Sequence, residues 1–462
     1  MTSKQRLFGT DGVRGVANKD LTAPMAMNLG MAAGRWLCDA APDSSHVRPH
    51  VRPFVVIGRD TRLSGDMLEA ALAAGLAAMG VDVVNVGVVP TPAVAQIVLA
   101  LGAAGGVVIS ASHNPFEDNG IKFFGGNGKK LPDRVEDEIT ALMERIDTLP
   151  RPTGTHIGRV TETHEPIQEY VRRVMATVGG AEAQPLQGLH LVMDCANGAA
   201  YQLAPEIFQT LGAELTVYSS QPNGININVE CGSTHPQQMA AAVRNSSAQA
   251  GLAFDGDADR VMLADEHGEI VDGDRMMAIL ALDLHRKGRL PGDVVVATIM
   301  SNVGLEQALA TEKIRLHRTD VGDRYVAEAM ETLGAAIGGE QSGHILLPFQ
   351  TPTGDGLVTA LQVLAIVRET GKTLSELASV VVSGPQLLKS VRVGSKQGWQ
   401  QDTDIQAAIT EGARRLGSAE WLSVRASGTE SLIRVMAQGT DKSTVEAVVH
   451  DICAVVQAKL GG

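Results

Sequence analysis

The chain has 462 residues, of which 44% are hydrophobic and 20% are charged, and these values exclude a disordered or fibrous protein. Its formal net charge is -13 and its lysines and arginines form no long run, so no nucleic-acid partner is expected. Aromatic residues make up only 3%, so aliphatic side chains and alanine must fill the cores.

The sequence predicts neither a secretory signal nor a membrane-spanning helix, so we expect a cytoplasmic protein without a membrane partner. The N-terminal stretch MTSKQRLFGTDGVRG has no apolar run after its basic residues. The most apolar stretch, 70–94, is interrupted by Asp82, Asn85, Pro90 and Pro92, too early for a membrane helix. The four cysteines are far apart and form no CxxC pair, which disfavours a disulfide framework and a zinc site.

Short runs rich in valine and isoleucine alternate with longer stretches rich in alanine and leucine, a pattern typical of an α/β fold with parallel sheets. The pattern occurs three times. Each set has three predicted strands followed by polar or Gly/Pro turns, and the strands begin near 55, 83 and 105, near 191, 215 and 251, and near 294, 314 and 335. Because ligands gather beyond the carboxyl ends of parallel strands, we expect the loops after the third strands to face one shared cleft.

Proline-containing polar segments near 150–166, 181–188 and 383–393 are candidate joints between domains. After about residue 381 the pattern changes, with a helical stretch through EGARRLG and a last helix from Asp441 onward. These features predict four domains, at 1–160, 161–265, 266–380 and 381–462.

The sequence DGDADR at 255–260 places carboxylates at every second position. In an extended segment such side chains share one face, so Asp255, Asp257 and Asp259 would converge on a hard divalent cation, for which Mg²⁺ fits better than Ca²⁺. An EF-hand loop is excluded because Arg260 stands where glycine is required and the flanks GLAF and VMLAD are typical of strands. A solvated acidic turn is the alternative, but three like charges after an apolar segment favour a metal.

Two further motifs give weaker signals. SASHNP at 110–115 offers Ser112 beside His113, but it lacks the GxSxG of a hydrolase elbow, and neighbouring side chains are expected to diverge. On its own it favours a turn with a capping hydroxyl. GGNGKK at 125–130 imitates a P-loop without the hydroxyl after lysine or the glycine spacing, so no nucleoside triphosphate site is predicted.

Other loops could bind a phosphorylated sugar. RASGTES at 425–431, with Arg434 shortly after, combines two guanidinium groups, two hydroxyls and a glycine, which are the components of a phosphate-binding loop. An ordinary turn between strands is the alternative. GGEQSGH at 338–344 and TGDG at 353–356 have small and polar residues suited to sugar hydroxyls, although each signal alone is weak.

Taken together, the motifs carry a resemblance. FGTDGVRG, SASHNP, DGDADR, GEQSGH and RASGTES, in this order, resemble the α-D-phosphohexomutase superfamily. GRDTRLSG at 58, VPTPAV at 89, DCANGA at 194 and PNGININ at 222 make the chain similar, more narrowly, to its bacterial phosphoglucosamine mutase branch. GEQS in place of GEMS favours the same branch, and the resemblance spans nearly the whole chain.

The resemblance implies an α/β fold of four domains around a central cleft, three similar to one another and a smaller C-terminal α+β domain. It implies an isomerase that interconverts glucosamine 6-phosphate and glucosamine 1-phosphate through a phosphoserine and a 1,6-bisphosphate, in the supply of UDP-N-acetylglucosamine and peptidoglycan precursors. The implied cofactors are one Mg²⁺ per chain, a phosphoryl group on Ser112, and glucosamine 1,6-bisphosphate or a similar bisphosphate as activator.

The resemblance also implies residue roles. Ser112 would carry the phosphoryl group and, with Asp255, Asp257 and Asp259, would hold the metal. Positive charge and proton transfer would come from Arg14, His113, Lys122, Arg260 and His344. The sugar and its non-reacting phosphate would be bound by Glu340, Ser342, Arg425, Ser427, Gly428, Thr429 and Arg434.

Two alternatives stay open. A phosphomannomutase/phosphoglucomutase would use the same loops, and a metal-dependent sugar-phosphate hydrolase or a non-catalytic sugar-phosphate binder would share part of them. The sequence also leaves open which residue is the general acid or base and whether the chain forms a homodimer.

Overall fold

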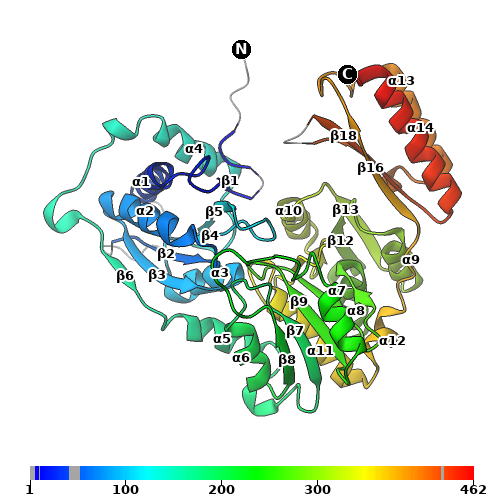
Figure 1. Cartoon of the computed structure of the whole chain (residues 1–462), viewed down its shortest axis with the longest axis horizontal. Helices are drawn as coiled ribbons and strands as arrows, with labels where there is room; N and C mark the ends of the chain where they lie inside the picture. The colour runs from blue at the N-terminus through cyan, green and yellow to red at the C-terminus, as the bar shows by residue number, and fades with distance from the viewer. Residues whose placement is uncertain (1–5, 10, 41–51, 428–430, 462) are drawn as a thin grey trace. The chain divides into compact units, whose positions relative to one another are not determined.

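The computed structural model describes residues 6–9, 11–40, 52–427 and 431–461. Helices and strands alternate along the chain, as the sequence pattern predicts (Figure 1). The chain divides into two compact units, one formed by 1–273 with 342–377 and the other by 274–341 with 378–462. In the part of the chain that the structure describes, no helix combines the length and the apolar character needed to cross a membrane.

The first domain is built on a six-stranded sheet in the order β1-β5-β4-β2-β3-β6. Strands β4, β2, β3 and β6 are parallel, whereas β5 is antiparallel to both β4 and β1. The strands are β1 (Val13–Val16), β2 (Phe54–Arg59), β3 (Asp82–Val88), β4 (Gly105–Ile109), β5 (Asp118–Gly125) and β6 (Val160–Glu162). The helices are α1 (Ala23–Ala40), α2 (Gly65–Ala78), α3 (Thr91–Leu101) and α4 (Asp133–Met143). The predicted joint at 150–166 thus contains an edge strand, β6, that pairs with β3.

Small residues let this aliphatic core pack closely. Helix α1 packs against α2, and a Cβ added at Gly75 would lie only 2.1 Å from the carbonyl oxygen of Met27. The two backbones therefore approach more closely than any larger residue would allow. Such contacts explain how a chain with so few aromatic residues fills its interior.

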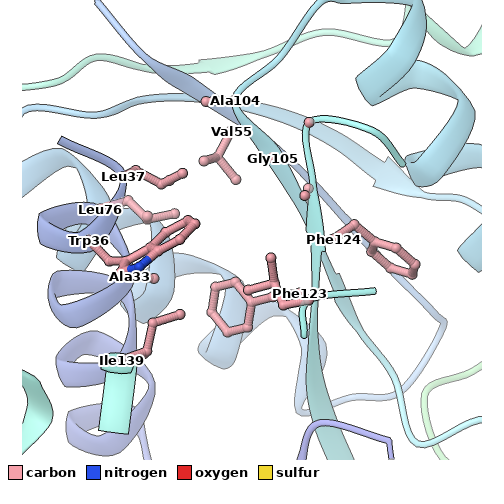
Figure 2. Close-up of a pocket in the computed structure, with 14 residues that line it drawn as sticks. Ala33, Trp36, Leu37, Val55, Leu76, Ala104, Gly105, Phe123, Phe124 and Ile139 are labelled. Atoms are coloured by element: carbon pink, nitrogen blue, oxygen red, sulfur yellow. The ribbon is translucent and has the colours of Figure 1, made fainter. Parts of the chain in front are cut away.

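An apolar cavity of about 170 Å³ lies inside this domain (Figure 2). It is lined by Trp36 of α1, Leu76 of α2, Phe123 of β5 and Ile139 of α4, among others. None of its lining residues is charged or nucleophilic. The cavity is therefore part of the hydrophobic core and offers no groups for chemistry.

The second domain repeats the arrangement with a five-stranded sheet in the order β11-β10-β9-β7-β8. The strands are β7 (His190–Asp194), β8 (Glu214–Tyr218), β9 (Ala250–Phe254), β10 (Val261–Ala264) and β11 (Ile270–Val271), and the helices are α5 (Ile167–Ala176), α6 (Leu203–Thr210) and α7 (Gln237–Arg244). Strand β7 pairs in parallel with β8 and β9, and β10 runs back antiparallel to β9.

The third domain has parallel strands in the order β13-β12-β14. They are β12 (Val294–Thr298), β13 (Arg315–Thr319) and β14 (Gly338–Gly339), with helices α8 (Gly273–Arg286), α9 (Val303–Thr311) and α10 (Asp323–Leu333). The segment that follows contains β15 (Ile345–Leu346), α11 (Gly356–Thr370) and α12 (Leu374–Ala378).

The threefold pattern is confirmed strand by strand. In each domain the first predicted strand lies between the second and the third, giving β3-β2-β4, β8-β7-β9 and β13-β12-β14. The third strand in each set leads directly into one of the polar loops identified from the sequence. Because this strand pairs in parallel with the first strand of its set, the loop lies at the carboxyl ends of the parallel strands.

The C-terminal domain is different, as expected. Its sheet, in the order β16-β18-β17, is antiparallel. The elements are β16 (Gln386–Arg392), α13 (Thr403–Leu416), β17 (Leu422–Ala426), β18 (Leu432–Gln438) and α14 (Lys442–Leu460). Asp441 caps α14 through a bond from the Thr444 backbone N–H, which confirms the predicted start of the last helix. Short 3₁₀ turns occur at 146–148, 154–156, 181–183, 291–293 and 419–421.

Candidate active site

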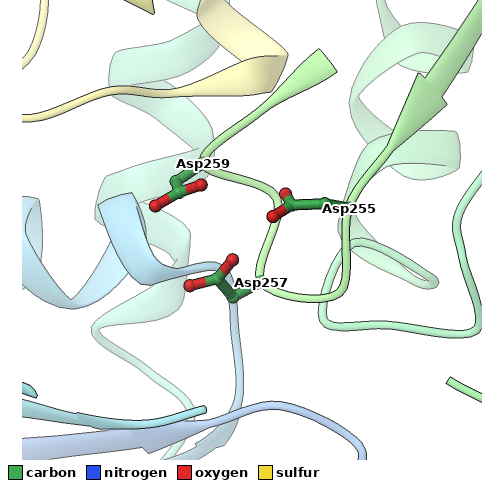
Figure 3. Close-up of side chains that lie close together, drawn as sticks. All are labelled: Asp255, Asp257 and Asp259. Carbon is green, nitrogen blue, oxygen red and sulfur yellow. The ribbon is translucent and has the colours of Figure 1, made fainter. Parts of the chain in front are cut away.

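Three carboxylates converge in the loop that follows β9 (Figure 3). One oxygen each of Asp255, Asp257 and Asp259 lies within 4.8 Å of the other two, and the residues are 0%, 2% and 4% exposed. Asp257 Oδ1 is buried and accepts no hydrogen bond from the residues that the structure describes. Buried carboxylate oxygens without donors fit a hard divalent cation such as Mg²⁺.

The physical reason for this convergence differs from the prediction. Residues 256–259 form turns and bends rather than an extended segment, and Ala258 has a φ of 57°. The carboxylates meet because the backbone folds back, so the expected alternation along a strand is wrong. The exclusion of an EF-hand is confirmed, since strands β9 and β10 flank the loop where that motif has helices.

The three carboxyls have different electrostatic environments. Burial, together with the charges of Asp257 and Asp259, raises the pKa of Asp255 well above its usual range. Burial acts in the same direction on Asp259, but His344 and Lys122 outweigh it and hold the pKa of that carboxyl well below its usual range. His344 Nδ1 lies 3.4 Å from Asp259 Oδ1, and Lys122 Nζ lies 3.9 Å from Asp259 Oδ2.

Further contacts from Arg260 and Thr91 hold the three carboxylates. The backbone N–H of Arg260 donates to Asp255 Oδ1 over 3.2 Å, and its Nε lies 3.8 Å from Asp259 Oδ1. The hydroxyl of Thr91, the first residue of α3, donates to Asp257 Oδ2 over 2.7 Å, and its backbone N–H donates to the Asp257 carbonyl over 2.9 Å. These contacts fix the orientation of the carboxylates.

Ser112 lies in the loop after β4, directly against this cluster. Ser112 is 3% exposed, and its Oγ donates a hydrogen bond to Asp255 Oδ2 over 2.6 Å. Its φ is 51°, a left-handed conformation that is uncommon for serine. The expectation that adjacent side chains diverge is wrong here, because Ser112 Oγ lies 3.3 Å from His113 Nδ1. The left-handed turn brings the two side chains together.

His113 is in an environment that favours its neutral form. Burial lowers the pKa of the imidazole, and the guanidinium groups of Arg260 and Arg14 lower it further. A neutral ring beside Ser112 Oγ can accept or pass on a proton at neutral pH. His113 therefore contributes less positive charge than the family resemblance implied.

Arg14 and Lys122 occupy neighbouring strands of the first sheet, β1 and β5. Arg14 Nη2 lies 3.4 Å from Asp11 Oδ2, and Lys130 Nζ lies 3.6 Å from Asp11 Oδ1. Although burial opposes ionisation, Lys122, Arg14 and Lys130 hold the pKa of Asp11 well below its usual range. Asp11 therefore lies between several cations near the loop that carries Ser112.

Lys130 belongs to the motif GGNGKK. This motif ends in a β-bridge between Phe124 and Lys130 and does not form a P-loop.

In the other compact unit, the predicted phosphate-binding residues form a cationic group. Arg425 on β17 is directly opposite Arg434 on β18. Burial and the charge of Arg434 lower the pKa of Arg425. The backbone N–H of Ser427 donates to the Leu432 carbonyl over 2.8 Å, and Lys396 Nζ donates to the Ser427 carbonyl over 2.7 Å. Asp320 acts on the pKa of Arg425 in the opposite direction. Two neighbouring guanidinium groups of this kind suit a phosphate ligand.

Glu340, Ser342 and His344 all lie in the short loop between β14 and β15. His344 reaches the Asp cluster, as described above. Gly428 and Thr429 lie outside the described residues.

Sequence reasoning missed several residues that position the site. They contact either the loop 255–260, called the Asp loop here, or the loop 110–118, called the serine loop. Thr91 contacts the Asp loop, and Asn228, Asp60 and Arg62 contact the serine loop. They stand in VPTPAV, PNGININ and GRDTRLSG, motifs that carried the resemblance but suggested no role. These motifs were the signal in the sequence that could have identified the positioning residues.

Family comparisons match the whole arrangement. Four family models of phosphoglucomutase/phosphomannomutase match in chain order: alpha/beta/alpha domain I at 5–150, domain II at 168–268, domain III at 272–383 and the C-terminal domain at 388–455. The chain belongs to the phosphoglucomutase/phosphomannomutase family. The expected four-domain α/β fold and the family are thereby confirmed.

Full-length relatives of this phosphohexomutase chain carry a narrower name. It is 50% identical over 457 residues to the phosphoglucosamine mutase of Symbiobacterium thermophilum, covering 98% of this chain and 99% of the relative. It is 49% identical to that of Mesorhizobium japonicum, covering 97% of each.

Solved phosphohexomutase structures share the fold. A phosphoglucomutase/phosphomannomutase family protein from Burkholderia thailandensis has a TM-score of 0.79 at 25% identity over 98% of both chains. The N-acetylphosphoglucosamine mutase of Aspergillus fumigatus, solved with GlcNAc-6P and magnesium, has a TM-score of 0.68 at 19% identity, covering 98% of this chain and 95% of that one.

Proposed function

We propose that this chain is a phosphoglucosamine mutase that interconverts glucosamine 6-phosphate and glucosamine 1-phosphate. The observation that carries the proposal is a strained, buried serine whose Oγ lies 2.6 Å from Asp255 in a cluster of three carboxylates. It is supported by the 50% identity to a phosphoglucosamine mutase over almost the full length of both chains. A serine held against such a cluster suits the transfer of a phosphoryl group.

The cluster suits one Mg²⁺ per chain. Asp255, Asp257 and Asp259 would hold it together with an oxygen of a phosphoryl group on Ser112, and the buried Asp257 Oδ1 is free to do so. When bound, the metal would withdraw electron density from the phosphorus that is transferred. Magnesium in the solved Aspergillus fumigatus relative is consistent with this assignment.

The first half-reaction moves the phosphoryl group from Ser112 to the sugar. The 1-hydroxyl oxygen of glucosamine 6-phosphate attacks phosphorus and gives up its proton to a nearby base. The bond from phosphorus to Ser112 Oγ breaks, and Oγ takes up a proton. His113, with its lowered pKa, and Lys122 are the candidates for proton transfer. The products are a free serine and glucosamine 1,6-bisphosphate.

The second half-reaction reverses the transfer at the other end of the sugar. Once the bisphosphate has turned over, Ser112 Oγ gives up its proton to a nearby base and attacks the phosphorus of the 6-phosphate. The bond from phosphorus to the sugar 6-oxygen breaks, that oxygen takes up a proton, and glucosamine 1-phosphate is released. The phosphoserine is restored. Arg14, Lys122, Arg260 and His344 would offset the negative charge that develops in both halves.

Binding of the sugar is assigned to the remaining loops. Arg425, Ser427, Gly428, Thr429 and Arg434 would hold the phosphate that is not reacting, which the opposed guanidinium groups support. Glu340 and Ser342 would bind ring hydroxyls in either orientation. The same residues must accept both ends of the sugar, since the substrate turns over once per cycle.

Related assignments complete the proposal. The domain limits 1–160, 161–265, 266–380 and 381–462 are supported by the ranges of the four family models. A bisphosphate such as glucosamine 1,6-bisphosphate would activate the chain by phosphorylating Ser112.

A substrate comparison tests the proposal. Glucosamine, glucose and mannose 6-phosphates are offered to the Mg²⁺-loaded protein, and the 1-phosphate products and free inorganic phosphate are measured separately. We expect the highest kcat/KM for glucosamine 6-phosphate and no release of phosphate. A preference for mannose or glucose would assign the chain to the phosphomannomutase/phosphoglucomutase alternative, and stoichiometric phosphate release would make it a hydrolase.

A further inference from the structure

The backbone of the serine loop is bound by one buried arginine. Four carbonyl oxygens, those of Ser112, Asn114, Pro115 and Asp118, all accept hydrogen bonds from the guanidinium group of Arg62. Nη2 donates to the Ser112 carbonyl over 2.8 Å and to the Asn114 carbonyl over 2.9 Å. The planar fork of arginine can bind several acceptors at fixed angles, which lysine cannot do.

Arg62 is itself held in place. Its Nε donates to Asp60 Oδ2 over 2.9 Å, and the side chains of both residues are 0% exposed. The same Asp60 oxygen accepts a 2.6 Å bond from Ser110 Oγ, which in turn accepts from the Ser112 backbone N–H over 2.9 Å. Asp60 therefore connects the arginine and the amide of the nucleophile.

A second donor reaches the same loop from the second domain. Asn228 Nδ2 donates to the Ser112 carbonyl over 2.9 Å and to the Asn114 carbonyl over 3.1 Å. Gly256, inside the Asp loop, also packs here, because an added Cβ would lie 2.5 Å from the Ser112 carbonyl oxygen. The amide, the carbonyl and the hydroxyl of Ser112 are thus all held, by Ser110, by Arg62 with Asn228, and by Asp255.

Stability alone is a poor reason for this arrangement. Removing a buried ion pair from water has a large cost in desolvation free energy. Such a pair is therefore often no more stabilising than apolar side chains of similar volume. The left-handed backbone of Ser112 adds strain, which persists only where the surroundings determine the conformation. A group that holds four carbonyls of the loop carrying the nucleophile does determine it.

We propose that Arg62 is a positioning residue for phosphoryl transfer. It holds the loop 112–118 so that Ser112 Oγ stays in line with the reacting oxygen of the sugar, and Asp60 orients Arg62 for this role. The inference rests on the proposed function for its kinetic part. Both side chains are fully buried, and both act through the backbone of Ser112.

The test compares Arg62→Lys with Arg52→Lys. Arg52 is a matched control, since it also pairs with an aspartate, Asp82, and donates to two backbone carbonyls, those of Thr155 and Ile157, away from the serine loop. We expect kcat of Arg62→Lys to fall about 100-fold, the loss that a displacement of roughly 1 Å causes, while KM changes less than about threefold. Arg52→Lys should keep the wild-type kcat.

Two further measurements do not depend on glucosamine turnover. Hydrogen exchange of peptides covering 110–118 should be faster in Arg62→Lys than in the wild type and unchanged in Arg52→Lys. Phosphorylation of Ser112 by glucose 1,6-bisphosphate, followed by intact mass, should be slower in Arg62→Lys alone. Absence of mutase activity in the wild type would refute the proposed function, while the exchange data would still decide the role of Arg62.

If Arg62→Lys does not fold, Asn228→Ala tests the same carbonyls from the other side, with an expected fall in kcat of about tenfold, corresponding to the loss of one buried donor. Wild-type kcat and wild-type exchange of 110–118 in Arg62→Lys, or in Asn228→Ala where that variant is used, would overturn the proposal.

Discussion

Removing the Thr91 hydroxyl should weaken metal binding without disturbing the fold. Thr91→Val replaces the hydroxyl with a methyl group of similar size, so the 2.7 Å hydrogen bond to Asp257 Oδ2 is lost. The backbone bond from the Thr91 N–H to the Asp257 carbonyl is retained. The carboxylate is then free to rotate, so Asp257 is no longer held in one orientation as a metal ligand.

The size of the effect follows from the burial of the bond. Both Thr91 and Asp257 are at most 2% exposed, and hydrogen bonds to charged groups contribute about 1.5–3 kcal/mol. At about 1.4 kcal/mol per factor of ten, this corresponds to a Kd for Mg²⁺ that is roughly 10- to 100-fold weaker. Loss of a partner that orients a metal ligand is known to have effects of the same order.

The measurement is calorimetric titration of Mg²⁺ together with the Mg²⁺ dependence of turnover. We expect a weaker Kd in Thr91→Val, a kcat at saturating Mg²⁺ close to that of the wild type, and recovery in Thr91→Ser, which keeps a hydroxyl. Thr140→Val is the control, because that hydroxyl donates only to the Glu136 carbonyl of its own helix over 2.8 Å. Equal Mg²⁺ affinity in Thr91→Val and the wild type would refute the reasoning.

Three further predictions concern other parts of the site. Ser112→Ala should fold but lose turnover together with the phosphoryl adduct seen by intact mass, and substantial turnover would contradict a covalent mechanism. Arg425→Ala should raise KM for glucosamine 6-phosphate about tenfold or more, since it removes charged hydrogen bonds to phosphate, and added glucose 1,6-bisphosphate should partly restore turnover; an unchanged KM without rescue would make the loop a structural turn. Burial raises the pKa of Asp355 to about 7, so the folded chain binds an extra proton between about pH 4 and 7 and loses stability as pH rises through that range. The free energy of unfolding of the wild type relative to Asp355→Asn should therefore fall from pH 5 to pH 8, and a constant difference would be inconsistent with this pKa.

Much of the fold was predictable because it depends on local patterns. Apolar runs of strand length, separated by helical stretches, identify three βα sets, and parallel pairing then places their third loops at the carboxyl ends of strands. The edge strand β6 was missed, because its three residues are all exposed and lack any apolar pattern. Its identity depends on pairing with β3, 77 residues away at Val83 and Val160.

The site was predictable in its residue types but not in its geometry. The Asp loop and Ser112 were recognised, yet the turn at Ala258 and the left-handed Ser112 depend on contacts outside their own segments. Thr91 and Asp257 are 166 residues apart, and Arg62 and Ser112 are 50 apart. No local signature can relate such pairs. Thr91 and Asp257 meet only when loops of two sheets come together, and Arg62 and Ser112 meet only when β2 and β4 pair in the first sheet.

These long-range hydrogen bonds and ion pairs offset the unfavourable free energy of burying three carboxylates together. A cluster of three carboxylates repels itself and loses hydration, so it cannot be stable as a feature of one loop. Here Asp255 is bonded to Ser112 and Asp257 to Thr91, both from the first domain, and Asp259 lies beside Lys122 and His344. The charge is thus distributed over several segments of one compact unit, each of which is anchored by its own sheet or helix. Because no single segment can hold the carboxylates, the metal site and the serine loop should form only when the first two domains have folded together, which couples the assembly of the catalytic groups to the assembly of the unit itself.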